Sequence, residues 1–212
     1  LDFIVNKSKK NFFNNIYEDI VLDKSATLKN IYLQNDKSSG YFHKYTKNKL
    51  ASGANLTSFI FPTGLRFNKL DLEFNLEGEN CVCNIQSAAF LNENDHQEVK
   101  TRVNHLYPNC KSYQKIKNVL NADSKGVYQG KIFVKDVAQK TDAYQLSKAI
   151  LLSERSEFNS KPELEIYADD VKCSHGSTSG SLDKDSIYYL MTRGLSKQES
   201  TKLLVESFLN EI

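Results

Sequence analysis

The densest group of reactive side chains in this sequence lies in the segment Asp169–Gly176, which holds two carboxylates, one thiol and one imidazole. Cys173 and His175 are two residues apart, so an extended backbone directs both side chains to the same side. A thiolate and an imidazole suit soft metal ions such as iron or zinc. They also serve as nucleophile and base in cysteine-dependent enzymes. The spacing alone leaves both interpretations open, beside that of a buried thiol next to a surface imidazole.

The other three cysteines offer no complete set of metal ligands. Cys81 and Cys83 lie far along the chain from Cys173, whereas a structural zinc site needs four ligands at close spacing. We interpret both as small core residues on one face of a strand. Cys110 has no candidate ligand near it in the sequence. Four cysteines in 212 residues indicate a reducing compartment rather than a disulfide framework.

The elements that must position these side chains are predicted to be short β-strands. In residues 69–78, four apolar side chains alternate with polar ones before a glycine, which is the pattern of a half-buried strand. Polar clusters at residues 35–40 and 121–126 predict turns between strands. The pattern fits a sandwich, a barrel or a β-solenoid and does not choose among them. Weaker alternation predicts further strands at Ile20–Leu22, Leu28–Leu33, Leu56–Phe61, Cys81–Ile85, Val127–Val134 and Leu164–Tyr167.

The end of the chain changes to helical periodicity. Asp183 is predicted to cap a helix that runs through Arg193, and Gly194 suits the left-handed position that follows a helix. Ser196 and Glu199 have the spacing of a capping box at the start of a second helix. This helix fits either packing on its own core or binding a partner. Its apolar stripe consists of Leu203, Leu204, Phe208 and Leu209.

Composition and missing motifs exclude several classes of function. A net charge of +2 does not indicate a nucleic-acid surface. No apolar run is long enough for a transmembrane helix, and no secretory signal is visible. Gly126–Ile132 comes nearest to a phosphate-binding loop, but it has one spacer too few and isoleucine at the magnesium position. The Ser/Gly run at residues 176–181 lacks a lysine and is interpreted as a flexible turn.

Four motifs, in their order along the chain, carry a resemblance to a known family. They are Val127–Val134, Ala138–Gln145, Lys161–Gly176 and Tyr188–Gly194. Together they resemble the SufB/SufD family of the SUF iron–sulfur cluster assembly system. The Lys-Cys-x-His-Gly sequence favours the SufD branch. The resemblance extends over most of the chain and is most specific over residues 127–194.

The resemblance implies a mainly β fold, with a right-handed parallel β-helix over residues 1–175 and a C-terminal helical hairpin over residues 176–212. Members of the family normally carry an additional N-terminal domain, so we expect this chain to be a core fragment. An exposed face of the β-helix would let the isolated fragment pair with itself. The expected compartment is the cytoplasm, or the plastid interior in a eukaryote.

The implied function is that of a non-enzymatic scaffold subunit, which pairs with SufB through the β-helix. The ATPase SufC would dock on the C-terminal helices. His175 and Cys173 would lie at the cluster-assembly interface and transiently hold metal from a nascent iron–sulfur cluster shared with SufB. The residues expected to contact SufC are Tyr188, Tyr189, Arg193, Leu203 and Phe208.

No cofactor is expected to be tightly bound by this chain, and the resemblance leaves open a flavin in the full complex. The alternative function is a Cys/His-dependent enzyme that uses Cys173 with His175. The sequence offers no orienting third group and no oxyanion element for such an enzyme. Any ATPase activity is expected to belong to SufC. We expect this chain to bind neither nucleic acid nor a membrane.

Overall fold

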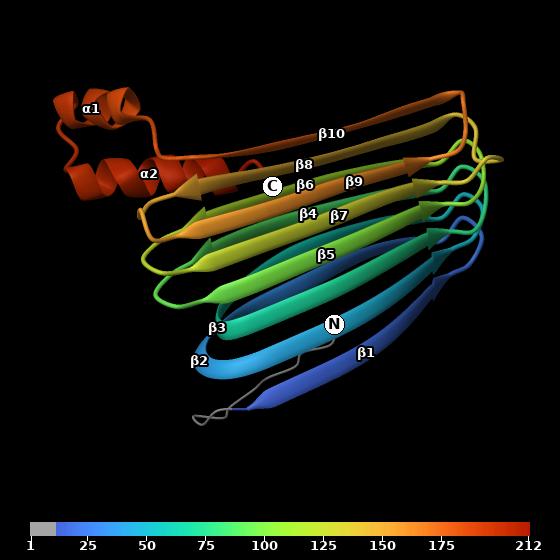
Figure 1. Ribbon diagram of the computed structural model, residues 1–212, viewed down its shortest axis with the longest axis horizontal. Helices are drawn as coiled ribbons and strands as arrows, with labels where there is room; N and C mark the ends of the chain where they lie inside the picture. Colours follow the sequence, from blue (N-terminus) through green and yellow to red (C-terminus); the bar gives the residue numbers. More distant parts are fainter. Residues whose placement is uncertain (1–11) are drawn as a thin grey trace.

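The computed structural model describes residues 12–212, without the side chains of residues 35–39. Ten strands are followed by two helices, α1 (Lys184–Thr192) and α2 (Lys197–Leu209). Figure 1 shows the strands stacked side by side and the two helices on the left, beyond the ends of the strands and beside β8 and β10. The strands are β1 (Phe13–Leu22), β2 (Thr27–Leu50), β3 (Asn55–Leu76), β4 (Val82–Leu91), β5 (His96–His105), β6 (Lys111–Leu120), β7 (Lys125–Val134), β8 (Thr141–Leu151), β9 (Glu157–Ile166) and β10 (Val171–Gly180).

The strands pair in parallel from coil to coil and form a β-solenoid of about six turns. Sheet I contains the first halves of β2 and β3, followed by β4, β6, β8 and β10. Sheet II contains β1, the second halves of β2 and β3, and then β5, β7 and β9. Paired residues are separated by 26 residues between Leu50 and Leu76 but by 32 between Val134 and Ile166. Because the coil length varies, the sequence shows no fixed repeat.

The corner that leads from sheet II to sheet I is built on left-handed backbone. In five successive turns one residue has a positive φ, and its amide donates to a carbonyl of the next coil. The series begins with Ser25 N and Ser52 O, 2.9 Å apart, and ends with Lys140 N and Asp170 O, 2.6 Å apart. These bonds satisfy backbone groups at each turn. The left-handed residues are Ser25, Gly53, Asn80, Asn109 and Lys140.

The interior of the solenoid combines an apolar core with buried polar side chains. The main hydrophobic cluster extends from Leu22 to Tyr128. Polar side chains also face inward, and Thr101 Oγ1 donates to Gln114 Oε1 at 2.6 Å. The Tyr128 hydroxyl lies 3.2 Å from the same oxygen. Polar residues at inward positions break the apolar alternation, which explains why β5, β6 and β8 are absent from the predicted strands.

The predicted parallel β-helix with C-terminal helices is confirmed, but two predicted turns are wrong. Residues 35–40 lie within β2, where register shifts between Asn35 and Tyr41 take the place of a turn. Asn35 and Ser38 pair with Thr63 and Leu65 of β3, so a polar sequence continues as strand. The Ser/Gly run at 176–181 belongs to β10 as far as Gly180. The proposed division between residues 175 and 176 therefore falls inside a strand, and the division itself stays a prediction.

The two helices begin and end as their sequences predict. Asp183 accepts hydrogen bonds from the amides of Asp185 and Ser186 at the start of α1. Gly194, which follows α1, has a φ of +96°. Ser196 and Glu199 form both bonds of the capping box of α2. Within residues 12–212, neither helix is long and apolar enough to cross a membrane.

Candidate functional site

Cys173 and His175 lie in the inward-facing row of β10, the last strand of sheet I. In the parallel register with β8, Cys173 pairs with Ala143 and His175 pairs with Gln145. Ala143 and Gln145 are both buried inside the solenoid. Because paired residues of parallel strands project to the same side, Cys173 and His175 continue the interior row into the final coil. The prediction that both side chains project to the same side is therefore met.

The two side chains differ in their surroundings. Cys173 is half-buried and packs against a cluster that includes Ile132, Val134 and Ala143. Burial raises the pKa of the Cys173 thiol, and the nearby Asp142 carboxylate raises it further. The thiol is therefore protonated at neutral pH. His175, one position further along the row, is exposed.

The next inward residue of β10 is tied into the interior by hydroxyl groups. Ser147 Oγ lies 2.9 Å from Ser177 Oγ and 2.8 Å from Ser160 Oγ. These contacts connect β10 with β8 and with β9 of the opposite sheet. The strand that carries His175 is thus fixed in position by its neighbours, although the imidazole itself is exposed.

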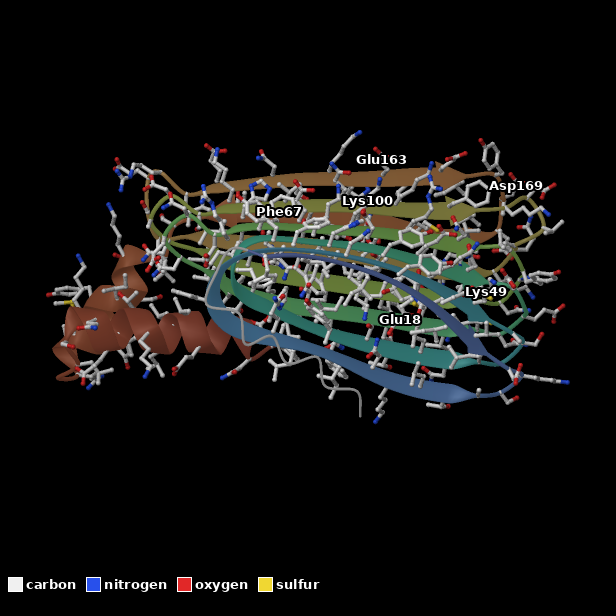
Figure 2. The ribbon with its side chains drawn as sticks, turned by 90° about the horizontal axis from the view of Figure 1, so that it is seen from below. Glu18, Lys49, Phe67, Lys100, Glu163 and Asp169 are labelled. Atoms are coloured by element: carbon white, nitrogen blue, oxygen red, sulfur yellow. The ribbon has the colours of Figure 1, made fainter. Side chains whose placement is uncertain are left out.

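The carboxylates of the cluster in the sequence do not join the thiol and the imidazole. Asp169 and Asp170 lie in the corner turn before β10, and both are exposed. Figure 2 shows Asp169 at the corner end of the stack, pointing away from it. Within residues 12–212, no group of three or more His, Cys, Asp or Glu side chains could hold a metal ion. Cys173 and His175 alone would supply two ligands and leave the remaining positions to another molecule.

The last coil ends in two open strand edges. Among residues 12–212, β10 pairs with β8 alone and β9 pairs with β7 alone. β9 contains Pro162, which a strand tolerates at the edge of a sheet, whereas β10 contains no proline. Figure 1 shows β1 at one end of the stack of strands and β9 and β10 toward the other. Open edges present unpaired N–H and C=O groups to a further strand.

The helical pair presents a second candidate surface. Tyr188, Tyr189 and Leu203 are 70%, 57% and 46% exposed, and α1 buries none of its residues. The Arg193 guanidinium lies 5.1 Å from the centre of the Tyr189 ring. A groove between the helices is lined by Asp183, Ser186, Tyr189, Leu190, Leu203 and Ser207.

Phe208, predicted with these residues as a partner contact, lies elsewhere. Its ring is half-buried, and the Lys117 ammonium of β6 lies 4.4 Å from the ring centre. Phe208 therefore contributes to the attachment of α2 to the solenoid. The structure thus groups Tyr188, Tyr189, Arg193 and Leu203 on the helical pair and separates Phe208 from them.

Comparison with known proteins identifies the family. A family model described as "SUF system FeS cluster assembly, SufBD core domain" matches residues 2–208. The chain belongs to the SufBD family. The predicted relationship to SufB and SufD is confirmed, and so is the assignment to SUF iron–sulfur cluster assembly.

Three relatives illustrate the extent of the similarity. The iron–sulfur cluster assembly protein SufD of Escherichia coli is 32% identical over 188 residues, which cover 89% of this chain and 44% of that protein. A SufBD family protein of Synechocystis is 29% identical over 95% of this chain and 44% of its own length. The chloroplastic protein ABCI7 of Arabidopsis thaliana is 27% identical over 98% of this chain and 44% of its own length. The chain thus spans less than half the length of these relatives.

Sequence reasoning missed two pairs of residues in this SufBD chain. Lys117 joins β6 to the end of α2, and its partner Glu211 lies 94 residues away. Cys110, which has no companion in the sequence, lies beside Cys81 of the neighbouring coil. The 29-residue register between β4 and β6 brings the two cysteines together. Only knowledge of the coil length would have revealed that pair.

Proposed function

We propose that this chain forms the core of a non-enzymatic scaffold subunit for iron–sulfur cluster assembly. The observation that carries the proposal is the position of Cys173 and His175 in the inward row of the last described strand, with an open edge beside them. A partner that continued the solenoid from this edge would enclose both side chains. A thiol and an imidazole in such a joint can hold iron or sulfide while the cluster, which is the substrate, is built.

SufB is the partner that we propose for the open end of the solenoid. SufB and SufD share a family core, so a SufB coil would present strands of similar length to β9 and β10. The β10 edge is the better template, because β10 contains no proline and its residues from Gly176 onward are small. Main-chain hydrogen bonds would supply affinity, and the enclosed side chains would supply the chemistry.

SufC is the partner that we propose for the helical pair. An α1 helix that buries none of its residues and exposes two tyrosines has apolar surface available to a second protein. Tyrosine and arginine are common anchors of protein interfaces, which favours Tyr188, Tyr189 and Arg193 as contacts. Leu203 would contribute apolar area from α2. Phe208 would contribute indirectly, because it holds α2 on the solenoid.

The alternative of a cysteine-dependent enzyme receives no support from the site. A catalytic cysteine acts as a thiolate and is found where its pKa is lowered. The pKa of Cys173 is raised instead, by burial and by Asp142. We therefore assign the chain a binding role, with ATP hydrolysis left to SufC.

The compartment that we propose is the bacterial cytoplasm, or the plastid interior if the source is a eukaryote. A bacterial SufD and a chloroplastic protein are both among the relatives. The buried thiols Cys81, Cys83 and Cys110 are free, as expected in a reducing compartment.

The first experiment is co-purification of the chain with SufB and SufC, with and without residues 183–212. We expect the intact chain to capture both partners, and the truncated chain to retain SufB and lose SufC. Loss of both partners on truncation would contradict the separate docking surfaces. Capture of neither partner by the intact, folded chain would contradict the scaffold role of this core.

The second experiment tests the site within the assembled complex. His175→Ala should reduce cluster formation without reducing the amount of SufB captured, because the imidazole is exposed and supports no packing. Ser174→Ala is the matched control, since Ser174 is also exposed but belongs to the opposite face of β10. Equal cluster formation by the two variants would contradict the role of His175.

A further inference from the structure

Cys81 and Cys110 occupy successive positions in a buried column at the corner between sheet II and sheet I. The column runs through Ala54, Cys81, Cys110 and Thr141, which are each at most 1% exposed. Val82 N donates to Ala54 O, and Lys111 N donates to Cys81 O at 2.8 Å, so the coils are in register at this point. Adjacent strands lie about 4.8 Å apart, which falls within the range of Cα separations that a disulfide can bridge, about 4.4–6.8 Å.

The two sulfur atoms converge on one carbonyl oxygen. Cys81 Sγ lies 3.2 Å from Gly78 O, and Cys110 Sγ lies 3.1 Å from the same oxygen. Gly78 is held close to the previous coil, because a Cβ there would lie 2.2 Å from Ser52 N. The acceptor shared by both thiols is thus fixed by the backbone.

Both sulfur atoms contact carbonyl groups of their own turn and of the preceding coil. Thr141 Oγ1 donates to Ala138 O, three residues earlier, and Cys81 makes the equivalent contact with Gly78 O. Cys81 Sγ also lies 3.2 Å from Ala51 O of its preceding coil, and Cys110 Sγ lies beside Gly78 O, 32 residues away in the chain. The sulfur of Cys110 is therefore directed toward the coil that carries Cys81.

The pair is also asymmetric in acidity and lies close to the surface. The neighbouring Cys110 thiol lowers the pKa of Cys81 to about 7, and the same interaction raises the pKa of Cys110. Cys81 is therefore the more acidic of the two thiols, and the thiolate is the reactive form. Glu79 and Asn80, in the turn that covers the sulfur, are exposed, so opening this single turn would uncover it.

We propose that Cys81 and Cys110 form a redox-active pair that closes to a disulfide between neighbouring coils by exchange with a small external disulfide such as oxidised glutathione. The Cys81 thiolate attacks one sulfur of the external disulfide and releases the first external thiolate. Cys110 then loses its proton and attacks the Cys81 sulfur, which releases the second external thiolate. Two protein thiols are oxidised and one external disulfide is reduced to two thiols. This inference does not depend on the proposed function.

The test is oxidation of the folded, full chain in a glutathione buffer at pH 8, followed by acid quenching, alkylation and peptide mapping by mass spectrometry. We expect a cross-linked peptide that joins Cys81 to Cys110, with Cys83 still alkylated and no loss of β-sheet circular dichroism. This measurement on the wild-type chain tests the proposal without the need for a variant. Cys81 and Cys110 both remaining reduced after Cys173 has reacted with glutathione would overturn the proposal, as would a disulfide that includes Cys83.

Single substitutions identify the order of the two steps. Cys110→Ser should stop the reaction at a mixed disulfide between Cys81 and glutathione, whereas Cys81→Ser should leave Cys110 unmodified. Cys83→Ser is the matched control, because Cys83 is equally buried and only two residues from Cys81. It should retain the full yield of the cross-link. A mixed disulfide on Cys110 in the Cys81→Ser chain would contradict the assignment of Cys81 as the attacking thiol.

Discussion

Lys117 of β6 donates from its Nζ atom to the Glu211 carboxylate at a distance of 2.5 Å, although the lysine side chain is only 1% exposed. The same ammonium donates to Phe208 O at 2.6 Å, and Lys115 Nζ donates to Glu211 O at 2.7 Å. Two lysines of one strand thus satisfy carbonyl groups at the end of α2, where the helix itself leaves them without partners. Cations at a helix C-terminus also interact favourably with the helix dipole.

Replacing Lys117 with methionine should release the end of α2 from the solenoid. Methionine keeps the length of the side chain but removes the donor to Phe208 O and Glu211, so we expect a loss of about 1–3 kcal/mol in the local stability of α2. Hydrogen exchange of the α2 amides measures this loss directly. Lys202→Met is the control, because the ion pair of Lys202 with Glu206 is exposed. Equal exchange rates in the two variants would show that Lys117 does not anchor the helix.

His105 should make the stability of the protein depend on pH. The imidazole is fully buried, and burial lowers its pKa to about 4. The unfolded chain binds a proton near pH 6.5 and the folded chain does not, so stability falls as the pH drops from 6.5 to 4, by as much as about 3 kcal/mol. Urea unfolding measures the free energy of unfolding at each pH. We expect this free energy to depend less on pH between 6.5 and 4 in His105→Gln than in the wild-type protein. His175→Gln, which changes an exposed histidine, is the control for loss of an imidazole.

Cys173 should react slowly with alkylating reagents at neutral pH, because burial and the Asp142 carboxylate raise its pKa. Asp142→Asn should speed alkylation by about two- to fivefold, because it removes a charge that raises the pKa of the thiol. Mass spectrometry of timed samples with iodoacetamide measures the rate. Asp136→Asn removes an exposed carboxylate from the turn before β8 and should have no effect. A Cys173 that reacts faster than free cysteine would revive the enzymatic alternative.

Ser196→Ala should destabilise α2 by about 1 kcal/mol, because it removes the side-chain oxygen that accepts from the Glu199 amide, which is one half of the capping box. The effect should be seen in hydrogen exchange of α2 and in weaker capture of SufC, while β-sheet circular dichroism stays unchanged. Ser207→Ala, in the last turn of the same helix, is the control for loss of a hydroxyl group. A larger effect of Ser207→Ala would indicate that the groove matters more than the helix start.

Much of the fold follows from local patterns that the sequence displays openly. Alternation predicts β3 because its inward residues, such as Leu70 and Phe74, are apolar and its outward residues are polar. The caps Asp183 and Ser196 predict the starts of both helices, since a capping side chain bonds to amides within three residues of itself. Local bonds of this kind are visible in the sequence without knowledge of the fold.

The features of the fold and of the site that could not be predicted are set by contacts with a neighbouring coil. Gln97, Gln114 and Gln145 look like outward residues of a loop, but each occupies an inward position of a strand that its neighbours complete. The same applies to the candidate site. Two residues of one motif, Cys173 and His175, predict a shared face, whereas the pairing of Cys81 with Cys110 depends on a coil length that varies along the chain.

The helical pair is joined to the solenoid at two points that are not adjacent. The chain enters α1 from the end of β10, and the end of α2 is held by Lys117 on β6, with β8 lying between these two strands. A force applied to the helices would therefore act on β10 and β6 together, on both sides of β8. The row of β10 that carries His175 would share in such a displacement, whereas a helical pair attached at one point alone would swing freely.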